Sequence, residues 1–293
     1  MSPNASQLSA LSRLFSSGVF REMARKGRSG LFARLFTQTG IAGSSGQTVG
    51  DAFDSAFAVL RRSGLRDEYA YRAALTQNIL LGTHSLNTAC MLTEFRAGAC
   101  KADLAILNGT ATVYEIKSER DSLARLANQI SNYQKIFAKI YVIAGEGHVR
   151  DVIESTPVDV GVMCLTRRHQ ITRIREATDR AGRVCPVTIF ESLRSTEARA
   201  ILQDLEVLVP DVPNTVLHSA MRDCFARLGP EEVHRAMVKT LKRTRSLAPL
   251  GAFVARLPVS LQPAALSIQI RCADQDRLVE AVSTPLLTAM DWT

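Results

Sequence analysis

The amino-acid sequence predicts an α/β fold in which a helix, a three-stranded antiparallel hairpin sheet, a second helix and a further strand form one core. Two observations carry this prediction: the helical spacing of apolar residues from 52 to 81, and three short β-compatible runs that turn signals separate. A third is the apolar run KIYVIA after the second helix, which is typical of a buried strand. A helical arm is expected before this core and a helical module after it.

Length and composition set the domain organisation. The chain has 293 residues, so one large domain or a domain with appended parts is expected. We predict a basic N-terminal helical arm and linker at 1–50, an α/β domain at 51–185 and a helical C-terminal module at 186–293. Hydrophobic residues make up 46% of the chain and charged residues 22%, which argues against general disorder.

Charge and cysteine usage bound the partners and the compartment. A net charge of +8 favours polyanions such as nucleic acid or anionic lipid. The cysteines form no C-x-x-C pair, no apolar run approaches the ~20 residues that cross a bilayer, and residues 1–20 lack a signal-peptide pattern. We therefore expect a cytoplasmic protein that has no membrane partner.

Both ends of the chain are expected to be basic and helical. Residues 1–50 combine arginines with leucines and phenylalanines and end in the Gly/Ser-rich GIAGSSGQTVG, which predicts a helical arm and a flexible linker. The arginines are typical either of a solvated face or of a nucleic-acid contact. Residues 186–293 include the basic stretch HRAMVKTLKRTRS, and this module is a candidate surface for a homodimer or a partner protein.

The central elements follow from local patterns. The runs MLTEF, ADLAIL and TVYEIK are predicted strands, separated by RAG and by the turn Asn108-Gly109. Ser118 is expected to cap the following helix, because its hydroxyl can accept from backbone N–H groups one turn on. After KIYVIA, the stretch GHVRDVIEST predicts a short helix, and VGVMCLT and QITRI predict further strands. The apolar stripe of the helix after Ser118 consists of Leu123, Leu126, Ile130, Tyr133 and Phe137.

One group of charged residues lies among these strands. Asp103 opens the second strand, and Glu115 and Lys117 close the third, where the single residue between them places both side chains on one face. Unpaired carboxylates beside apolar neighbours are costly, and a divalent cation would offset that cost. The sequence therefore predicts a metal site here if Asp103 shares this face.

The hairpin register decides whether it does. A two-residue loop at Asn108-Gly109 would place Asp103 on the face opposite Glu115. We therefore predict a three-residue loop, 107–109, with Gly109 in the left-handed bulge position, or an equivalent bulge. In that geometry residue 106 pairs with residue 110, and Asp103 lies across from Val113 on the face of Glu115.

These residues resemble a known group of enzymes. A strand Asp, a second strand ending in Glu-Ile-Lys and a following helix resemble the PD-(D/E)XK superfamily of restriction-endonuclease-like and RecB-like nucleases, over roughly residues 65–176. The segment ACKADLAILNGTATVYEIKSERDSLARLANQISNYQKIF also resembles a largely uncharacterised bacterial family within it. The resemblance implies a restriction-endonuclease-like core and a Mg²⁺- or Mn²⁺-dependent hydrolase of phosphodiester bonds in DNA, with endo- or exonucleolytic attack left open. Ala102 stands where the superfamily pattern has proline.

The resemblance also implies roles for single residues. Asp103 and Glu115 would ligate the metal, whose preference is for hard oxygen ligands, and Lys117 would position or polarise the attacking water. Gln129 and Tyr133 lie one helical turn apart and resemble the Q-x-x-x-Y motif of RecB-like members, which contacts substrate near the metal. Tyr133 fits core packing equally well, because it belongs to the apolar stripe.

A further acidic ligand is expected, and two residues could supply it. Glu94 in MLTEF is preferred over Glu68 in DEYAYRAAL because Glu94 lies on a strand nearer the motif. Either residue could equally be a solvated surface carboxylate that binds no metal.

Three alternatives stay open. Glu115 and Lys117 could form an exposed hairpin salt bridge that binds no metal. The chain could be a catalytically inactive nuclease-fold protein that serves as a DNA-binding or protein-interaction component of a defence or mobile-element system. It could also be a helical interaction protein whose basic patches, at 13–34 and 235–245, bind RNA or acidic partners.

Overall fold

The computed structural model describes residues 3–293 and contains two compact units. A sheet unit comprises Asn78–Thr166 and Gln170–Ala248, and a helical unit comprises Met1–Gln77, Arg167–His169 and Pro249–Thr293. Residues 1 and 2 of the expected N-terminal arm lie outside the described residues. Every helix among residues 3–293 is too short or too polar to cross a lipid bilayer.

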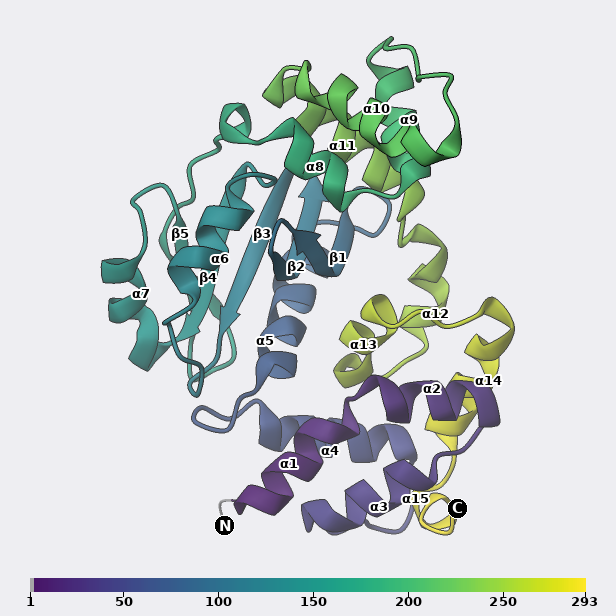
Figure 1. Ribbon diagram of the computed structural model, residues 1–293. Helices are drawn as coiled ribbons and strands as arrows, with labels where there is room; N and C mark the ends of the chain where they lie inside the picture. Colours follow the sequence, from purple (N-terminus) through teal and green to yellow (C-terminus); the bar gives the residue numbers. More distant parts are fainter. Residues whose placement is uncertain (1–2) are drawn as a thin grey trace. The chain divides into compact units, whose positions relative to one another are not determined.

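A mixed six-stranded sheet forms the centre of the sheet unit (Figure 1). Its strands are β1 (Cys90–Ala97), β2 (Cys100–Asn108), β3 (Thr110–Lys117), β4 (Lys139–Gly145), β5 (Gly161–Leu165) and β6 (Ile171–Arg175), in that spatial order. β1, β2 and β3 are antiparallel, β3, β4 and β5 run parallel, and β6 returns antiparallel to β5. Helix α6 (Leu126–Tyr133) lies in the connection from β3 to β4, because a parallel pair requires a crossover.

The strand predictions are confirmed. The three runs expected between residues 90 and 117 are β1, β2 and β3, and KIYVIA is β4. From Ile140 to Gly145 every residue of β4 is buried, as expected for an apolar strand between two parallel neighbours. The stretch GHVRDVIEST contains helix α7 (Val149–Ser155), and VGVMCLT and QITRI contain β5 and β6.

The helix after β3 begins later than expected. Both the backbone N–H and the hydroxyl of Ser118 donate to Oδ2 of Asp121, at 2.9 and 2.8 Å. Ser118 therefore closes a local turn, and α6 begins only at Leu126. The prediction that Ser118 caps this helix is wrong because Asp121 engages its hydroxyl.

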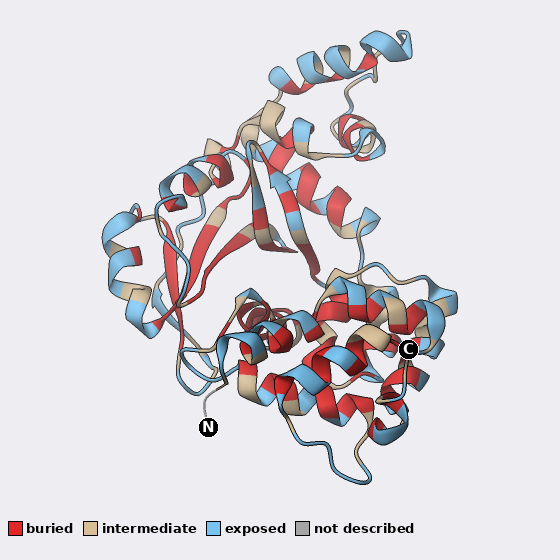
Figure 2. Ribbon diagram, turned by 60° about the horizontal axis from the view of Figure 1, so that its bottom comes forward, coloured by how far each residue is buried: buried red, intermediate tan, exposed pale blue. Residues whose placement is uncertain are grey.

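One hydrophobic core joins the sheet to the helices that follow it in sequence. These helices are α8 (Pro186–Ser192), α9 (Ser195–Asp204), α10 (Asn214–Ala226) and α11 (Pro230–Thr244). Val113 of β3, Tyr133 of α6, Phe225 of α10 and Met237 of α11 belong to the same buried cluster. Figure 2 shows buried residues along the strands and on one side of each of these helices. The helices therefore complete the sheet unit.

The helical unit unites the beginning and the end of the described chain. Its helices are α1 (Ala5–Leu14), α2 (Ser17–Lys26), α3 (Gly30–Thr39), α4 (Val49–Leu60), α5 (Glu68–Leu75), α12 (Gly251–Ala255), α13 (Gln262–Ser267), α14 (Cys272–Ser283) and α15 (Leu286–Ala289). The Phe53 ring packs against those of Phe15 and Phe32, with centroids 5.7 and 5.0 Å away. Arg277 of α14 donates to the backbone oxygen of Arg25 at 2.8 Å, so α2 and α14 are tied directly.

The boundaries of the two units differ from the expected divisions at residues 50 and 185. Helices α1, α2 and α3 bury apolar faces within the helical unit, so they are not an arm on a flexible linker. The expected C-terminal module is divided near residue 248, because α8 to α11 bury their apolar faces on the sheet whereas α12 to α15 belong to the helical unit. Local composition does not reveal which distant segment covers an apolar helix face.

Candidate functional site

The hairpin between β2 and β3 is tighter than expected. Asn108 pairs with Thr110 around Gly109, whose φ of 71° is the left-handed conformation that glycine adopts without strain. Ile106 consequently pairs with Thr112, so the predicted pairing of residue 106 with residue 110 is wrong.

The conclusion about faces nevertheless holds. The ladder pairs Leu104 with Tyr114, and the same register places Asp103 opposite Glu115 rather than opposite Val113. A shift of two positions preserves the face because side chains alternate with a period of two. Asp103 and Glu115 therefore occupy facing positions on the same side of the sheet.

The carboxylate of Asp103 is bound to the neighbouring strand. The regular ladder between β2 and β3 ends at Leu104 and Tyr114. Beyond it, the backbone N–H of Ile116 donates to Oδ2 of Asp103 at 2.8 Å. A hydrogen bond to an ionised acceptor is stronger than a neutral one, so it orients this half-exposed carboxylate beside Glu115.

Glu115 is a buried carboxylate with two donors. Its side chain is 1% exposed, Oε1 lies 2.8 Å from Nζ of Lys117, and Oε2 accepts the hydroxyl of Tyr133 at 2.6 Å. The Lys117 side chain is 5% exposed. The alternative of an exposed salt bridge between Glu115 and Lys117 is therefore wrong, because the ion pair exists but is buried. A buried carboxylate requires such partners to compensate for the loss of water.

Helix α6 contributes the remaining two site residues. Nζ of Lys117 donates to Oε1 of Gln129 at 2.9 Å, so the ammonium group bridges β3 and α6. The Tyr133 ring packs in the core beside Phe137, while its hydroxyl also lies 2.9 Å from the backbone oxygen of Lys101. Burial raises the pKa of Tyr133, and the Glu115 carboxylate raises it further, so the phenol stays protonated as a donor. Tyr133 thus combines packing with a polar contact in the site.

The position of α6 depends on a contact that sequence reasoning missed. Oδ1 of Asn132 accepts the backbone N–H of Ala99 at 3.1 Å, in the turn between β1 and β2. Gly98 in this turn has a φ of 59°, and a Cβ there would lie 2.5 Å from Oδ1 of Asn132. A glycine is therefore required for α6 to approach the turn, and the RAG run was the available signal.

Glu94 lies beside Asp103. The register of β1 and β2 places these residues opposite each other, and a carboxylate oxygen of Glu94 lies within 4.8 Å of one of Asp103. Glu94 is exposed, forms an ion pair with Lys101 at 3.8 Å, and has a φ of 51°, which is uncommon for a residue with a side chain. Such strain inside a strand is typical of functional sites.

Glu68 lies in the helical unit. It is an exposed residue in the first turn of α5, where it forms an ion pair with Arg72 one helical turn later. The sheet unit by itself therefore unites Glu94, Asp103 and Glu115 in adjacent strands. Carboxylate oxygens are the ligands that Mg²⁺ and Mn²⁺ prefer, and Glu94 and Asp103 offer such oxygens close together, whereas both oxygens of Glu115 already contact Lys117 and Tyr133.

The fold and this cluster define an α/β protein with a group of acids and one lysine on adjacent strands of a mixed sheet. The chain belongs to the family described as Bacteriophage P4 protein cII, whose model matches residues 61–247. That range contains every site residue named above and ends one residue before the end of the sheet unit at Ala248.

Two similar proteins accompany this family match. Protein cII of Enterobacteria phage P4 is 34% identical over 165 residues, which cover 54% of this chain and 59% of that relative. A solved structure of a protein of unknown function from Silicibacter pomeroyi is similar over 57% of this chain and 94% of that one, with 17% identity and a TM-score of 0.29. At that TM-score, neither fold nor function is inferred from the second likeness.

Proposed function

We propose that this chain is a metal-dependent nuclease of the PD-(D/E)XK kind that hydrolyses phosphodiester bonds in DNA in the cytoplasm. The observation that carries the proposal is the union of Asp103, Glu115 and Lys117 on one face of the sheet, in contact with Gln129 and Tyr133 of α6. The order of helix, three antiparallel strands, helix and parallel strand supports a restriction-endonuclease-like core.

Asp103 and Glu115 would hold Mg²⁺ or Mn²⁺, and Glu94 is the neighbouring acid that could join them. The bound cation would neutralise charge that builds on the phosphate during hydrolysis. Lys117 would orient the attacking water, since its ammonium group is held in place by Gln129. Tyr133 would keep the Glu115 carboxylate turned toward the site through its short hydrogen bond.

A cleavage assay tests this proposal. Purified protein is incubated with linear, circular and single-stranded DNA and with RNA, each in Mg²⁺, in Mn²⁺ and in EDTA. We expect metal-dependent DNA cleavage that Lys117→Ala abolishes and that Lys26→Ala, an exposed lysine of α2, leaves intact. Cleavage of circular DNA would show endonucleolytic attack, whereas cleavage that persists in Lys117→Ala would exclude this site.

One observation favours a second candidate, a catalytically inactive nuclease-fold protein that binds DNA or a protein in a defence or mobile-element system. Both carboxylate oxygens of Glu115 are already satisfied, one by Lys117 and one by Tyr133. Ala102 also replaces the proline of the superfamily pattern. Metal-independent DNA binding without cleavage of any of the four substrates would support this candidate over the enzyme.

A further inference from the structure

A pocket lies among the helices α8, α9 and α10, apart from the strands that carry the acidic cluster. It encloses about 290 Å³ and is lined by residues of all three helices. Packed protein interiors contain few voids larger than one water molecule, which occupies about 30 Å³ in the liquid. A space of this size is close to the lower end of ligand sites, which is about 300 Å³.

The floor of the pocket is apolar and belongs to the hydrophobic core. Phe190, Ala198, Leu217 and Met221 line it and are buried members of the core cluster. The ring of Phe190 also packs against the ring of His218, with centroids 4.8 Å apart. The floor therefore offers contacts to a flat or aliphatic group, on side chains that core packing holds in place.

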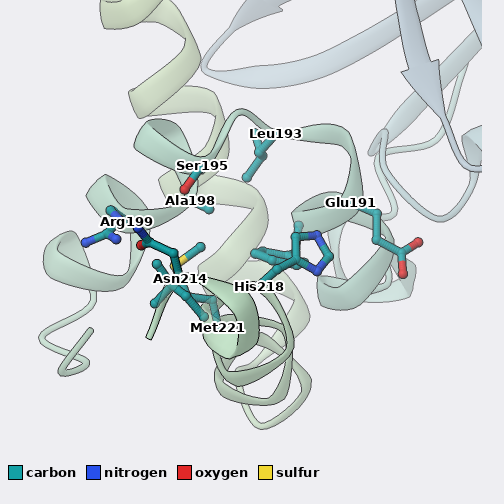
Figure 3. A pocket seen from close by; sticks show the side chains of 10 residues that line it. Glu191, Leu193, Ser195, Ala198, Arg199, Asn214, His218 and Met221 are labelled. Carbon is teal, nitrogen blue, oxygen red and sulfur yellow. The ribbon is translucent and has the colours of Figure 1, made fainter. Parts of the chain in front are cut away.

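The rim of the pocket is polar and positively charged. In Figure 3, Arg199 and Asn214 lie at one end and His218 at the other, whereas the carboxylate of Glu191 points away from the other labelled side chains. Glu191 forms an ion pair with Arg222 at 3.4 Å. Within residues 3–293, Arg199 has no carboxylate partner, so its guanidinium group is available to an anion.

The start of α10 adds to this charge, whereas Glu197 in the first turn of α9 offsets the partial charge at the start of that helix. Ser195 and Asn214 line the pocket and are the first residues of α9 and α10. Helix N-termini carry partial positive charge and free N–H groups, and the first turn of α10 contains no acidic residue to offset them.

We infer that this pocket binds a small organic anion in which a carboxylate or phosphate is attached to an apolar ring or short chain. The apolar portion occupies the floor over Phe190 and Met221, and the anionic group pairs with Arg199 at the rim. An inorganic anion lacks the apolar portion and a neutral aromatic molecule lacks the charge, so each uses only half of the site. This binding site is independent of the proposed nuclease chemistry.

Methyl-selective NMR tests the inference on the full chain. The protein is labelled at its methionine methyl groups, and the Met221 signal is assigned from Met221→Leu. Benzoate and phenyl phosphate are each expected to shift this signal in a saturable way, which also tells a carboxylate from a phosphate preference. Benzyl alcohol and inorganic phosphate are expected to bind at least about tenfold more weakly, since each loses one set of contacts.

Matched variants identify the residues responsible. Arg199→Gln is expected to weaken benzoate binding about tenfold, whereas Arg227→Gln, which removes an exposed arginine at the far end of α10 that does not line the pocket, leaves it unchanged. Ser195→Trp, at an exposed position of the rim, is expected to block the pocket. An unmoved Met221 signal, equal binding of inorganic phosphate, or full affinity in Arg199→Gln would each overturn the inference.

Discussion

Two buried carboxylates in the sheet unit, Glu115 and Glu197, are stabilised by different sets of partners. Each side chain is 1% exposed and each pairs with a cation at 2.8 Å. Glu197 accepts two hydrogen bonds from Arg245, one from the backbone N–H of Arg194 and one from the hydroxyl of Thr244. The side chain of Glu115 contacts one cation, Lys117, and one hydroxyl donor, that of Tyr133.

The surroundings of the two carboxylates explain the difference. Arg245 reaches Glu197 of α9 from the end of α11 and lies over the Phe95 ring at 5.3 Å, so the pair fastens helices to β1. Glu115 faces Asp103, which in turn lies beside Glu94. Carboxylates repel one another unless a cation compensates them, so the cluster around Glu115 is the candidate functional site, whereas the bonds of Glu197 are those of a structural contact.

Asp103→Asn should have the largest effect on DNA cleavage, and it separates a role in metal binding from a role in stability. The amide oxygen can still accept the N–H of Ile116, so we expect little change in the free energy of unfolding. Loss of a metal-ligand charge should lower DNA cleavage by on the order of 10³-fold, which is ~4 kcal/mol. Initial rates and urea denaturation measure the two quantities. Unchanged cleavage would contradict the role proposed for Asp103.

Arg245→Leu should act on stability alone. It leaves Glu197 buried without its main partner, which should cost about 3 kcal/mol of unfolding free energy in urea denaturation. Replacing Glu197 by Leu in the same variant should recover most of this loss, because no unpaired charge is left. A loss of specific activity per folded molecule would show instead that this pair supports the site.

Lys117→Met should reveal whether the Glu115 cluster binds a cation. The variant leaves Glu115 without its ammonium partner and should be less stable without metal. Saturating Mg²⁺ should then raise its unfolding free energy by about 2 kcal/mol more than that of the double variant Asp103→Asn/Lys117→Met, which lacks one of the proposed metal ligands. Equal responses of these two variants in thermal unfolding would show that Mg²⁺ does not bind at this cluster.

The smallest expected effect is a pH dependence at Glu197. Burial opposes ionisation of this carboxyl, but the hydrogen bonds from Arg245 and Arg194 outweigh it and lower the pKa below its ordinary value of 4.5. A depressed folded-state pKa contributes stability above the unfolded value and loses it as the pH falls through the folded value. Between about pH 6 and pH 3, Glu197→Gln should therefore lose less unfolding free energy than the natural chain. An equal loss of unfolding free energy in both proteins would contradict a pH-dependent contribution of Glu197 to stability.

Local pattern was sufficient for the strands and for the shared face of the site. Strand-like runs in the sequence located β1 to β6, and the period of two placed Glu115 and Lys117 together. The register was not accessible, because it depends on whether Gly109 alone or with its neighbours forms the turn. The contact of Asn132 with the β1–β2 turn and the pairing of Glu197 with Arg245 join residues too far apart in sequence for any spacing rule.

The tie between Arg277 and Arg25 has a consequence for the order in which the chain folds. These residues are 252 positions apart, so α2 cannot pack against α14 until Arg277 has left the ribosome. All residues of the sheet unit have been synthesised once Ala248 has been added to the chain. Until Trp292, which packs against the Phe32 ring with centroids 6.0 Å apart, has also emerged, Phe32 stays partly uncovered, and a nascent chain in that state is expected to depend on chaperones more than the folded protein does.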